Sequence, residues 1–270
     1  MKNKHVFAMT ALALAGFTSF SSCSSDDDDG PILVFEIPLN AKLENPAPAG
    51  RSETGLLTMQ LYADNTLDYS FRVDNLTTGD ALTMAHFHTG DPVTNGPIIL
   101  PFPSWTGNAS SGTFSLRQSL ADSLKNRSND IYFNVHSTQH PSGLVRGTVN
   151  SDLLLAETIN MSGANEVPPV VTTATGVALL RLTVDGKLYS KVTVTDLPPA
   201  DALTMAHIHA GATGANGDVL VPLCATAADF GVSKMTQLNE ATANALRTQA
   251  LYVNAHSNNW PDGVIRGQIR

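Results

Sequence analysis

Short stretches in which apolar and polar residues alternate follow one another through most of the chain. Residues 67–73 (LDYSFRV) and 188–194 (LYSKVTV) carry apolar side chains at every second position, the period of a β-strand with one buried face. Residues 55–62 and 176–184 are further strand candidates, and Asp185–Gly186 is typical of a tight hairpin turn. The pattern predicts an all-β protein of antiparallel sandwiches or barrels.

One helical segment is expected in each half of the chain. Leu116, Leu120 and Leu124 recur at every fourth position, and Ser115 and Gln118 have the spacing of a helix-capping box. Residues 238–247 form the corresponding segment of the second half. A short helix is therefore predicted in each half.

The pattern also repeats as a whole. DALTMAH occurs at residues 80–86 and again at 201–207, and YFNVHS at 132–137 recurs as YVNAHS at 252–257. The repeating unit is roughly 115–120 residues long, which is longer than the repeat of a solenoid and favours tandem domains. We predict one domain over residues 33–150 and a second over residues 151–270.

The N-terminal segment has the features of a secretory signal. Residues 1–22 combine two lysines with an apolar run too short for a typical membrane span, and they end in small residues before Cys23. This arrangement resembles the lipobox of bacterial lipoproteins, whose cysteine is acylated after cleavage; the alternative is an ordinary signal peptide followed by a chance cysteine. Residues 23–32 would then be a lipidated cysteine and an acidic tether.

The four aspartates that follow Cys23 repel one another and favour an extended tether. They resemble the acidic export signal of Bacteroidota lipoproteins, although a solvated spacer has the same composition. We expect an extracytoplasmic lipoprotein of the outer membrane, surface-exposed or, as the alternative, facing the periplasm, which contacts the membrane through its lipid anchor.

The charge and cysteine content exclude several classes of function. The formal net charge is −8 and no basic stripe is visible, which argues against nucleic acid as a partner. Two cysteines, Cys23 and Cys224, cannot supply a disulfide framework. Cys224 has no counterpart in the first unit and is predicted to be a buried, small apolar residue.

Several motifs of the second unit identify a family. They are NEVPP at 165–169, HIH at 207–209, YVNAHS at 252–257 and PDGVIRGQI at 261–269. Together they resemble the CHRD domain, a chordin-type module. The first unit is less similar, since ENPAP at 44–48 and LVRG at 144–147 replace the expected sequences. The resemblance implies an immunoglobulin-like β-sandwich outside the cell, in a tandem CHRD lipoprotein similar to those of Bacteroidota. It names no ligand, because fold similarity does not carry function with it.

Six of the eight histidines occupy matched positions in the two units. Residues i and i+2 of a strand share one face, so both histidines of each His-x-His motif point together, opposite an apolar face. Neighbouring strands would bring three imidazoles together in each unit, which suits zinc or copper. The two sets are His86, His88 and His136, and His207, His209 and His256.

Two other interpretations of the histidines stay open. The first is a structural hydrogen-bond network with Asn134 and Arg146 in one unit and Asn254 and Arg266 in the other; a nearby arginine would also disfavour a cation. The second, acid–base catalysis, is the weakest. No carboxylate is found near the motif in both units, and Ser137 follows its histidine directly, which places it on the opposite face of a flat strand. The protein is therefore not expected to be an enzyme.

Two functions follow from these patterns. The first is a non-catalytic binding or adhesion module whose loops contact an unidentified extracellular protein or glycan. An outward aromatic patch, with Trp105 and Trp260 as candidates, would support this function. The second is an envelope protein that binds zinc or copper through the histidine clusters.

Overall fold

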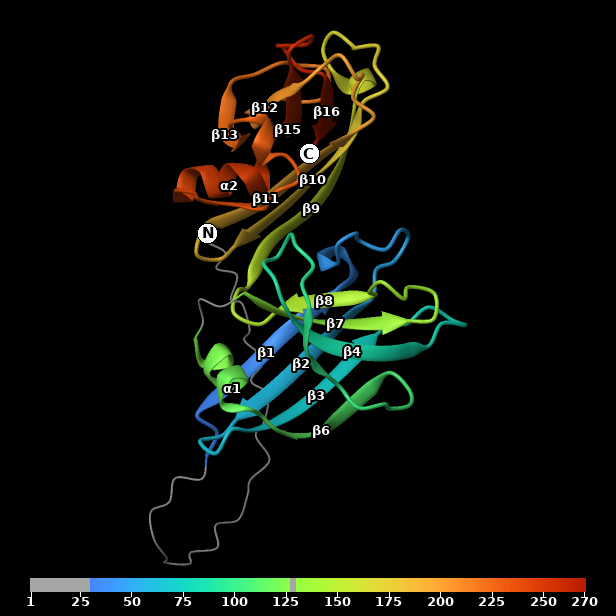
Figure 1. Ribbon diagram of the computed structural model, residues 1–270, viewed down its shortest axis with the longest axis vertical. Coiled ribbons are helices and arrows are strands. Elements are labelled where there is room, and N and C mark those ends of the chain that lie inside the picture. Colours follow the sequence, from blue (N-terminus) through green and yellow to red (C-terminus); the bar gives the residue numbers. More distant parts are fainter. Residues whose placement is uncertain (1–29, 127–129) are drawn as a thin grey trace, which may run out of the picture. The chain divides into compact units, whose positions relative to one another are not determined.

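The computed structural model describes residues 30–126 and 130–270. Within these ranges the first domain contains eight strands and one α-helix, with a 3₁₀ turn over Ala41–Leu43 (η1) between the first two strands. In chain order these are β1 (Leu33–Asn40), β2 (Thr54–Leu61), β3 (Thr66–Asp74), β4 (Leu82–Thr89), β5 (Ile98–Pro101), β6 (Ala109–Ser115), α1 (Gln118–Lys125), β7 (Ile131–Ser137) and β8 (Val145–Thr148) (Figure 1).

The second domain repeats this order, with the 3₁₀ turns η2 (Gly163–Asn165) and η3 (Ala227–Asp229). Its elements are β9 (Leu153–Ser162), β10 (Thr175–Thr183), β11 (Lys187–Thr195), β12 (Leu203–Ala210), β13 (Val219–Cys224), β14 (Lys234–Gln237), α2 (Glu240–Thr248), β15 (Leu251–Ser257) and β16 (Ile265–Gln268).

Each domain is built on one antiparallel sheet of eight strands. The strand order is β5-β4-β7-β8-β1-β2-β3-β6 in the first domain and β13-β12-β15-β16-β9-β10-β11-β14 in the second. Strands β8 and β1 pair through Asn40 and Arg146, and β9 and β16 through Ser162 and Arg266. The two layers of each sandwich are therefore four-stranded halves of one continuous sheet. The predicted all-β, antiparallel class with a short helix in each repeat is confirmed.

The two halves of each sheet enclose an apolar core. In the first domain Phe71 of β3 meets Phe133 of β7, with 5.3 Å between the ring centroids, so side chains from opposite halves are in contact. Phe87 also packs against Phe133. The positions that correspond to these three rings hold Val192, Ile208 and Val253 in the second domain, all of them buried. The second core is thus aliphatic, and it includes the buried Cys224, as the sequence predicted.

The helices follow the leucine pattern but not the predicted cap. Leu120 and Leu124 are buried, as is Leu116 just before the helix. The N-cap residue of α1 is Arg117, and it makes no side-chain capping bond. The capping box of Ser115 and Gln118 was therefore a wrong prediction. The expected signal segment 1–22, Cys23 and the aspartates of the tether lie outside the described residues. No helix in the described part of the chain is long and apolar enough to cross a membrane.

Candidate functional site: a histidine cluster in each domain

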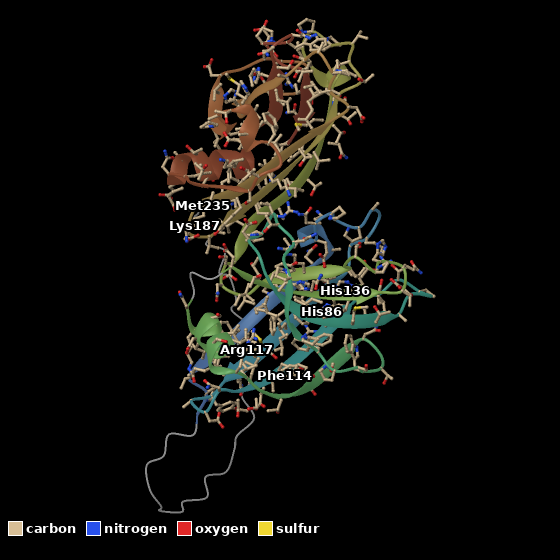
Figure 2. The ribbon with its side chains drawn as sticks, viewed as in Figure 1. His86, Phe114, Arg117, His136, Lys187 and Met235 are labelled. Atoms are coloured by element: carbon tan, nitrogen blue, oxygen red, sulfur yellow. The ribbon has the colours of Figure 1, made fainter. Side chains whose placement is uncertain are left out.

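The histidines of the first domain come from two neighbouring strands of its sheet, β4 and β7. The pairing sets His86 opposite Asn134, His88 opposite Tyr132, and Met84 opposite His136. Residues directly opposite one another in an antiparallel pair project on the same face of the sheet. The intervening residues, among them Phe87, project into the core. The predicted convergence of His86, His88 and His136 on one face is therefore observed. Figure 2 shows where His86 and His136 lie in the first domain.

This face is buried rather than open to solvent. His86, His88 and His136 are each 8% exposed, and all seven residues of β7 are buried. The histidines lie opposite the apolar face of their strands, as the alternation predicted, and this polar side of the sheet is itself covered. The loop between β4 and β5 and the segment after β1 supply hydrogen-bond partners on this side of the sheet. The histidines consequently lie in a small polar interior.

Backbone carbonyls fix the protonation pattern of two of these rings. His88 Nδ1 lies 2.8 Å from the Gly96 carbonyl oxygen, and His136 Nδ1 lies 2.9 Å from that of Pro141. A carbonyl oxygen can only accept, so both Nδ1 atoms must carry the proton. The Nε2 atoms of His88 and His136 are then unprotonated and can only accept. A carbonyl that holds one ring nitrogen in this way is the usual outer shell of a metal-bound histidine.

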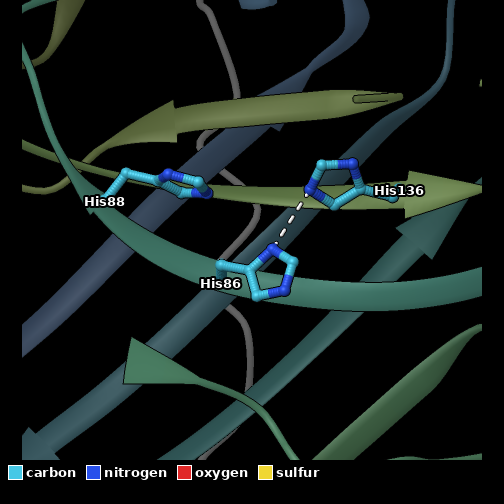
Figure 3. A group of neighbouring side chains, drawn as sticks. All are labelled: His86, His88 and His136. Carbon is cyan, nitrogen blue, oxygen red and sulfur yellow. Dashed lines mark hydrogen bonds between the residues drawn. The ribbon is translucent and has the colours of Figure 1, made fainter. Parts of the chain in front are cut away.

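The three side chains each direct one ring nitrogen to a common point. These nitrogens lie within 4.8 Å of one another. His86 Nδ1 is 3.2 Å from His136 Nε2, the contact drawn as a dashed line in Figure 3. His88 Nε2 is buried and has no hydrogen-bond partner among the described residues. A buried acceptor of this kind costs free energy unless something binds to it.

The second domain reproduces the cluster. His209 Nδ1 lies 2.9 Å from the Gly217 carbonyl oxygen, and His256 Nδ1 lies 2.9 Å from that of Pro261. His207 Nδ1 is 3.2 Å from His256 Nε2, and His209 Nε2 is again buried without a described partner. The donor atoms of these three histidines also lie within 4.8 Å of one another.

A stacked arginine and tyrosine back each cluster. The Arg146 guanidinium carbon lies 3.4 Å from the centre of the Tyr132 ring, and that ring stacks on His88 at 4.8 Å between centroids. Arg266 and Tyr252 repeat the arrangement, with Arg266 3.3 Å from the ring centre. This stack restricts the rotation of one imidazole in each domain.

Arg146 influences the position of His88 indirectly, because it holds the β4–β5 loop that bonds to His88. Its guanidinium donates to the carbonyl oxygens of Asp91 and Thr94 and to Asn95 Oδ1. The loop then presents the Gly96 carbonyl to His88. Arg266 makes the matching bonds to Ala212, Ala215 and Asn216. The two arginines predicted to belong to a network therefore position the β4–β5 loop and its counterpart. Their carbonyl acceptors were not predictable, because every residue carries a backbone carbonyl.

Asn134 and Asn254, the other predicted network residues, also lie in this buried layer. Asn134 lies close to His88 and to the carboxyl group of Glu44, but no hydrogen bond joins it to His88 Nε2. Asn254 donates to the Asp262 carbonyl oxygen at 3.4 Å. The Oδ1 atom of each asparagine is buried without a described hydrogen-bond partner.

A buried carboxyl group in each domain was missed by the sequence analysis, which found no carboxylate near both motifs. Glu44 follows η1 and Glu166 follows η2, and they are 3% and 5% exposed. Desolvation raises the pKa of each carboxyl group to about 7, against the attraction of Arg146 and Arg266. The signal was present in the aligned ENPAP and NEVPP motifs, whose glutamates correspond.

Two glycines accommodate these carboxyl groups. Gly143 and Gly263 have φ of 137° and 135°, which side-chain-bearing residues rarely adopt. A Cβ atom would lie 2.6 Å from Glu44 Oε1 at the first position and 2.5 Å from Glu166 Oε1 at the second. The glycines of the PSG and PDG sequences are thus needed both for the turn and for the approach of the carboxyl group.

Burial favours the neutral form of His86, His88, His136, His207 and His256. Burial lowers the pKa of His86 to about 4, and the neighbouring His136 and His88 lower it further. Burial also lowers the pKa of His207, of His136 and of His256. Neutral imidazole is the form that binds metal ions.

The residues considered for other functions lie elsewhere or are already engaged. Ser137 Oγ accepts from the His140 amide, and Ser257 Oγ from the Trp260 amide. Trp105 and Trp260 pack against the two apolar cores. The large apolar side chains that are exposed in the described ranges are all aliphatic or methionine. The tryptophans consequently do not form the outward aromatic patch that an adhesion surface would use.

These features define a tandem all-β protein with one cluster of three histidines in each repeat. The family model of the CHRD domain matches residues 35–149 and 158–269, and the chain belongs to this family. CHRD domains are generally regarded as non-catalytic binding modules. No curated protein and no solved structure matches the chain.

Proposed function

We propose that each CHRD domain binds one transition-metal ion through its three histidines, and that the protein is a non-catalytic metal-binding protein. The main support for this proposal is that one imidazole nitrogen in each domain has no hydrogen-bond partner among the described residues. His88 Nε2 and His209 Nε2 are buried without a described partner, and each is directed toward two further imidazoles. Zinc and copper are the metals that such nitrogen sets bind.

The distances support a shared ion. Nitrogen ligands about 2.0–2.1 Å from a tetrahedral metal lie roughly 3.4 Å apart. The His86–His136 and His207–His256 nitrogen pairs are 3.2 Å apart. The third nitrogen of each set lies within 4.8 Å, so a small side-chain rotation closes the site. Three protein nitrogens leave one position for a further ligand.

A purely structural network explains these contacts less well. Hydrogen bonds among the imidazoles account for the His86–His136 contact and for both carbonyl contacts. Among the histidine nitrogens they leave one buried lone pair in each domain unsatisfied, although nearly all buried polar groups in proteins are bonded. The same nitrogen is unsatisfied in both domains, and a metal ion would bind to it.

Elemental analysis of the purified protein tests the proposal. We expect two equivalents of zinc or copper per chain after metal loading, one in His88→Ala, and none in the His88→Ala, His209→Ala double variant. A ligand at about 100 times its dissociation constant stabilises the protein by about 2.7 kcal/mol. The melting temperature of wild type should therefore rise with added metal, and that of the double variant should stay constant.

His140 provides a matched control. Its side chain has no counterpart in the second unit, and its backbone alone bonds to Ser137. His140→Ala should retain both equivalents. Wild-type protein that binds no metal, together with a lowered melting temperature in the double variant, would instead establish the structural network.

We further propose that this binding takes place outside the cytoplasm, on a lipoprotein attached through Cys23. The support is the signal-like segment at 1–22, the lipobox-like position of the cysteine and the aspartates behind it. Acyl chains contribute about 0.8 kcal/mol for each buried methylene, so more than one anchors a protein durably. Metabolic labelling with a fatty acid should mark wild type and fail to mark Cys23→Ser. Labelling of both, or of neither, would contradict the anchor.

An extracellular protein or glycan is the remaining candidate partner of a surface module. The packing of both tryptophans leaves this adhesion role without a specific surface in the described residues. Metal binding is accordingly the function that the geometry favours.

A further inference from the structure

An exposed methionine stands beside each histidine cluster. Met84 lies two residues before His86 on β4, and the strand register sets it directly opposite His136 on β7. Alternation along the strand places Met84, His86 and His88 on one face. Met84 is 44% exposed, whereas the histidines are 8% exposed. Met84 is thus the solvent-exposed neighbour of the buried histidines on this face.

The second domain has a methionine at the equivalent sequence position. Met205 lies two residues before His207 on β12 and is 40% exposed. Burial of apolar surface does not account for either side chain, and the aromatic core residues of the first domain were not retained in the second. Both copies nevertheless keep methionine at this position.

Two properties of the site select among metals. A thioether is a soft ligand that favours Cu(I), whereas zinc takes its ligands from thiolate, imidazole and carboxylate. The buried guanidinium of Arg146 acts electrostatically on His88, and its repulsion of a bound ion grows with the charge of that ion. A singly charged, soft ion satisfies both conditions.

We infer that Met84 and Met205 are the fourth ligands of the two sites, and that the preferred ion is Cu(I), held by three imidazoles and one thioether. This inference rests on the proposed metal-binding function and names the ion. The exposed position of each methionine leaves the thioether free to rotate inward when the ion arrives. Its three flexible side-chain bonds make that movement inexpensive.

The test compares two ions in wild type and in a Met84→Leu, Met205→Leu double variant. Leucine conserves the volume and removes the sulfur. Cu(I) affinity is measured without oxygen by competition with a chromogenic chelator, and Zn²⁺ affinity by calorimetry. We expect Cu(I) affinity to fall at least about tenfold, the loss that follows even removal of an outer-shell partner. Zn²⁺ affinity should change by less than about twofold, because zinc does not use the thioether.

Met235→Leu is the matched control, since Met235, labelled in Figure 2, is 53% exposed and lies on the edge strand β14. It should leave both affinities unchanged. A direct readout is copper-edge absorption of selenomethionine-labelled protein, which should show a copper–selenium path that the double variant lacks.

The outcomes separate the two proposals. Unchanged Cu(I) affinity in the double variant, or the absence of the selenium path, overturns the methionine ligands and leaves metal binding intact. An equal loss of Cu(I) and Zn²⁺ affinity assigns the methionines a structural role and overturns the inference as well. Failure of wild type to bind either ion removes the proposed function and the inference together.

Discussion

The two domains have the same histidine cluster on differently built cores. Phe71, Phe87 and Phe133 form an aromatic core in the first domain, and the corresponding positions of the second are aliphatic. The hydrogen bonds of the clusters nevertheless agree closely. The Nδ1 contacts to glycine carbonyls are 2.8 and 2.9 Å, and those to proline carbonyls are both 2.9 Å.

This difference shows which contacts determine the site. Aromatic and aliphatic cores present side chains of different size to the sheet, yet the opposite face keeps one arrangement of rings and carbonyls. The geometry therefore depends on the polar layer, in which the arginine–tyrosine stack, the loop and the buried glutamate recur. Substitutions in the cores should affect the domains unequally, and substitutions in the polar layer should affect them alike.

The largest effect is expected from truncation of the aromatic core. Phe133→Ala should lower the free energy of unfolding of the first domain by about 3–5 kcal/mol, as removal of a buried phenylalanine does. Val253→Ala, at the corresponding position, removes two methyl groups and should cost about 2 kcal/mol. Urea denaturation of the full chain at equilibrium measures both.

Each domain holds one tryptophan packed on its own core, which allows the transitions to be assigned. Fluorescence of a Trp260→Phe background follows Trp105 and hence the first domain, and a Trp105→Phe background follows the second. Equal losses of unfolding free energy for Phe133→Ala and Val253→Ala would contradict the expectation that the aromatic and the aliphatic core contribute differently to stability.

The next effect concerns the arginines of the polar layer. Arg146→Met and Arg266→Met each leave two loop carbonyls without their donor in a buried position. Each should cost about 3 kcal/mol in its own domain, the range for breaking a buried charged network. The same single-tryptophan backgrounds report the losses.

Equal losses would support the polar layer as the common element of the domains. Arg247→Met serves as the control, because Arg247 lies on the exposed side of α2 and should change stability by less than about 0.5 kcal/mol. A loss of stability confined to one domain would mean that the similar hydrogen-bond distances of Arg146 and Arg266 do not correspond to similar contributions to stability.

Much of the fold follows from local sequence patterns. Period-two runs and the repeat predicted the strands and the two domains, because alternation is a local property. The cap of α1 was predicted wrongly, since Arg117 rather than Ser115 precedes the first helical turn. The junction of β8 with β1, which makes one sheet of two layers, depends on contacts between residues far apart in the chain.

The site was likewise predicted only where it depends on local sequence patterns. The shared face of His86 and His88 follows from their spacing, and the approach of His136 follows from the pairing of adjacent strands. Burial of that face does not follow, because the covering comes from the β4–β5 loop and from Glu44, each distant in sequence. The internal repeat identified the matched histidines, but it did not identify the backbone carbonyls that orient them.

The smallest of these effects is a pH dependence set by the buried carboxyl groups. Desolvation raises the pKa of Glu44 and of Glu166 to about 7 from an ordinary value of 4.5. The folded state thus favours the protonated form, and the resulting stability is fully present below pH 4.5 and lost as the pH rises through 7. Glu44→Gln or Glu166→Gln removes the titration.

Relative to wild type, each glutamine variant should therefore gain about 2 kcal/mol in its own domain between pH 5 and pH 8. Denaturation in the presence of a metal chelator measures this gain. The lowered pKa of His86 acts in the opposite direction, since it removes stability as the pH falls from 6.5 toward 4, but it is common to variant and wild type and cancels in the difference. Glu36→Gln on the exposed face of β1 should show no such gain. Parallel pH profiles for wild type and the buried variants would mean that both carboxyl groups are ionised throughout, and that the arginine in each polar layer is neutralised by a full charge.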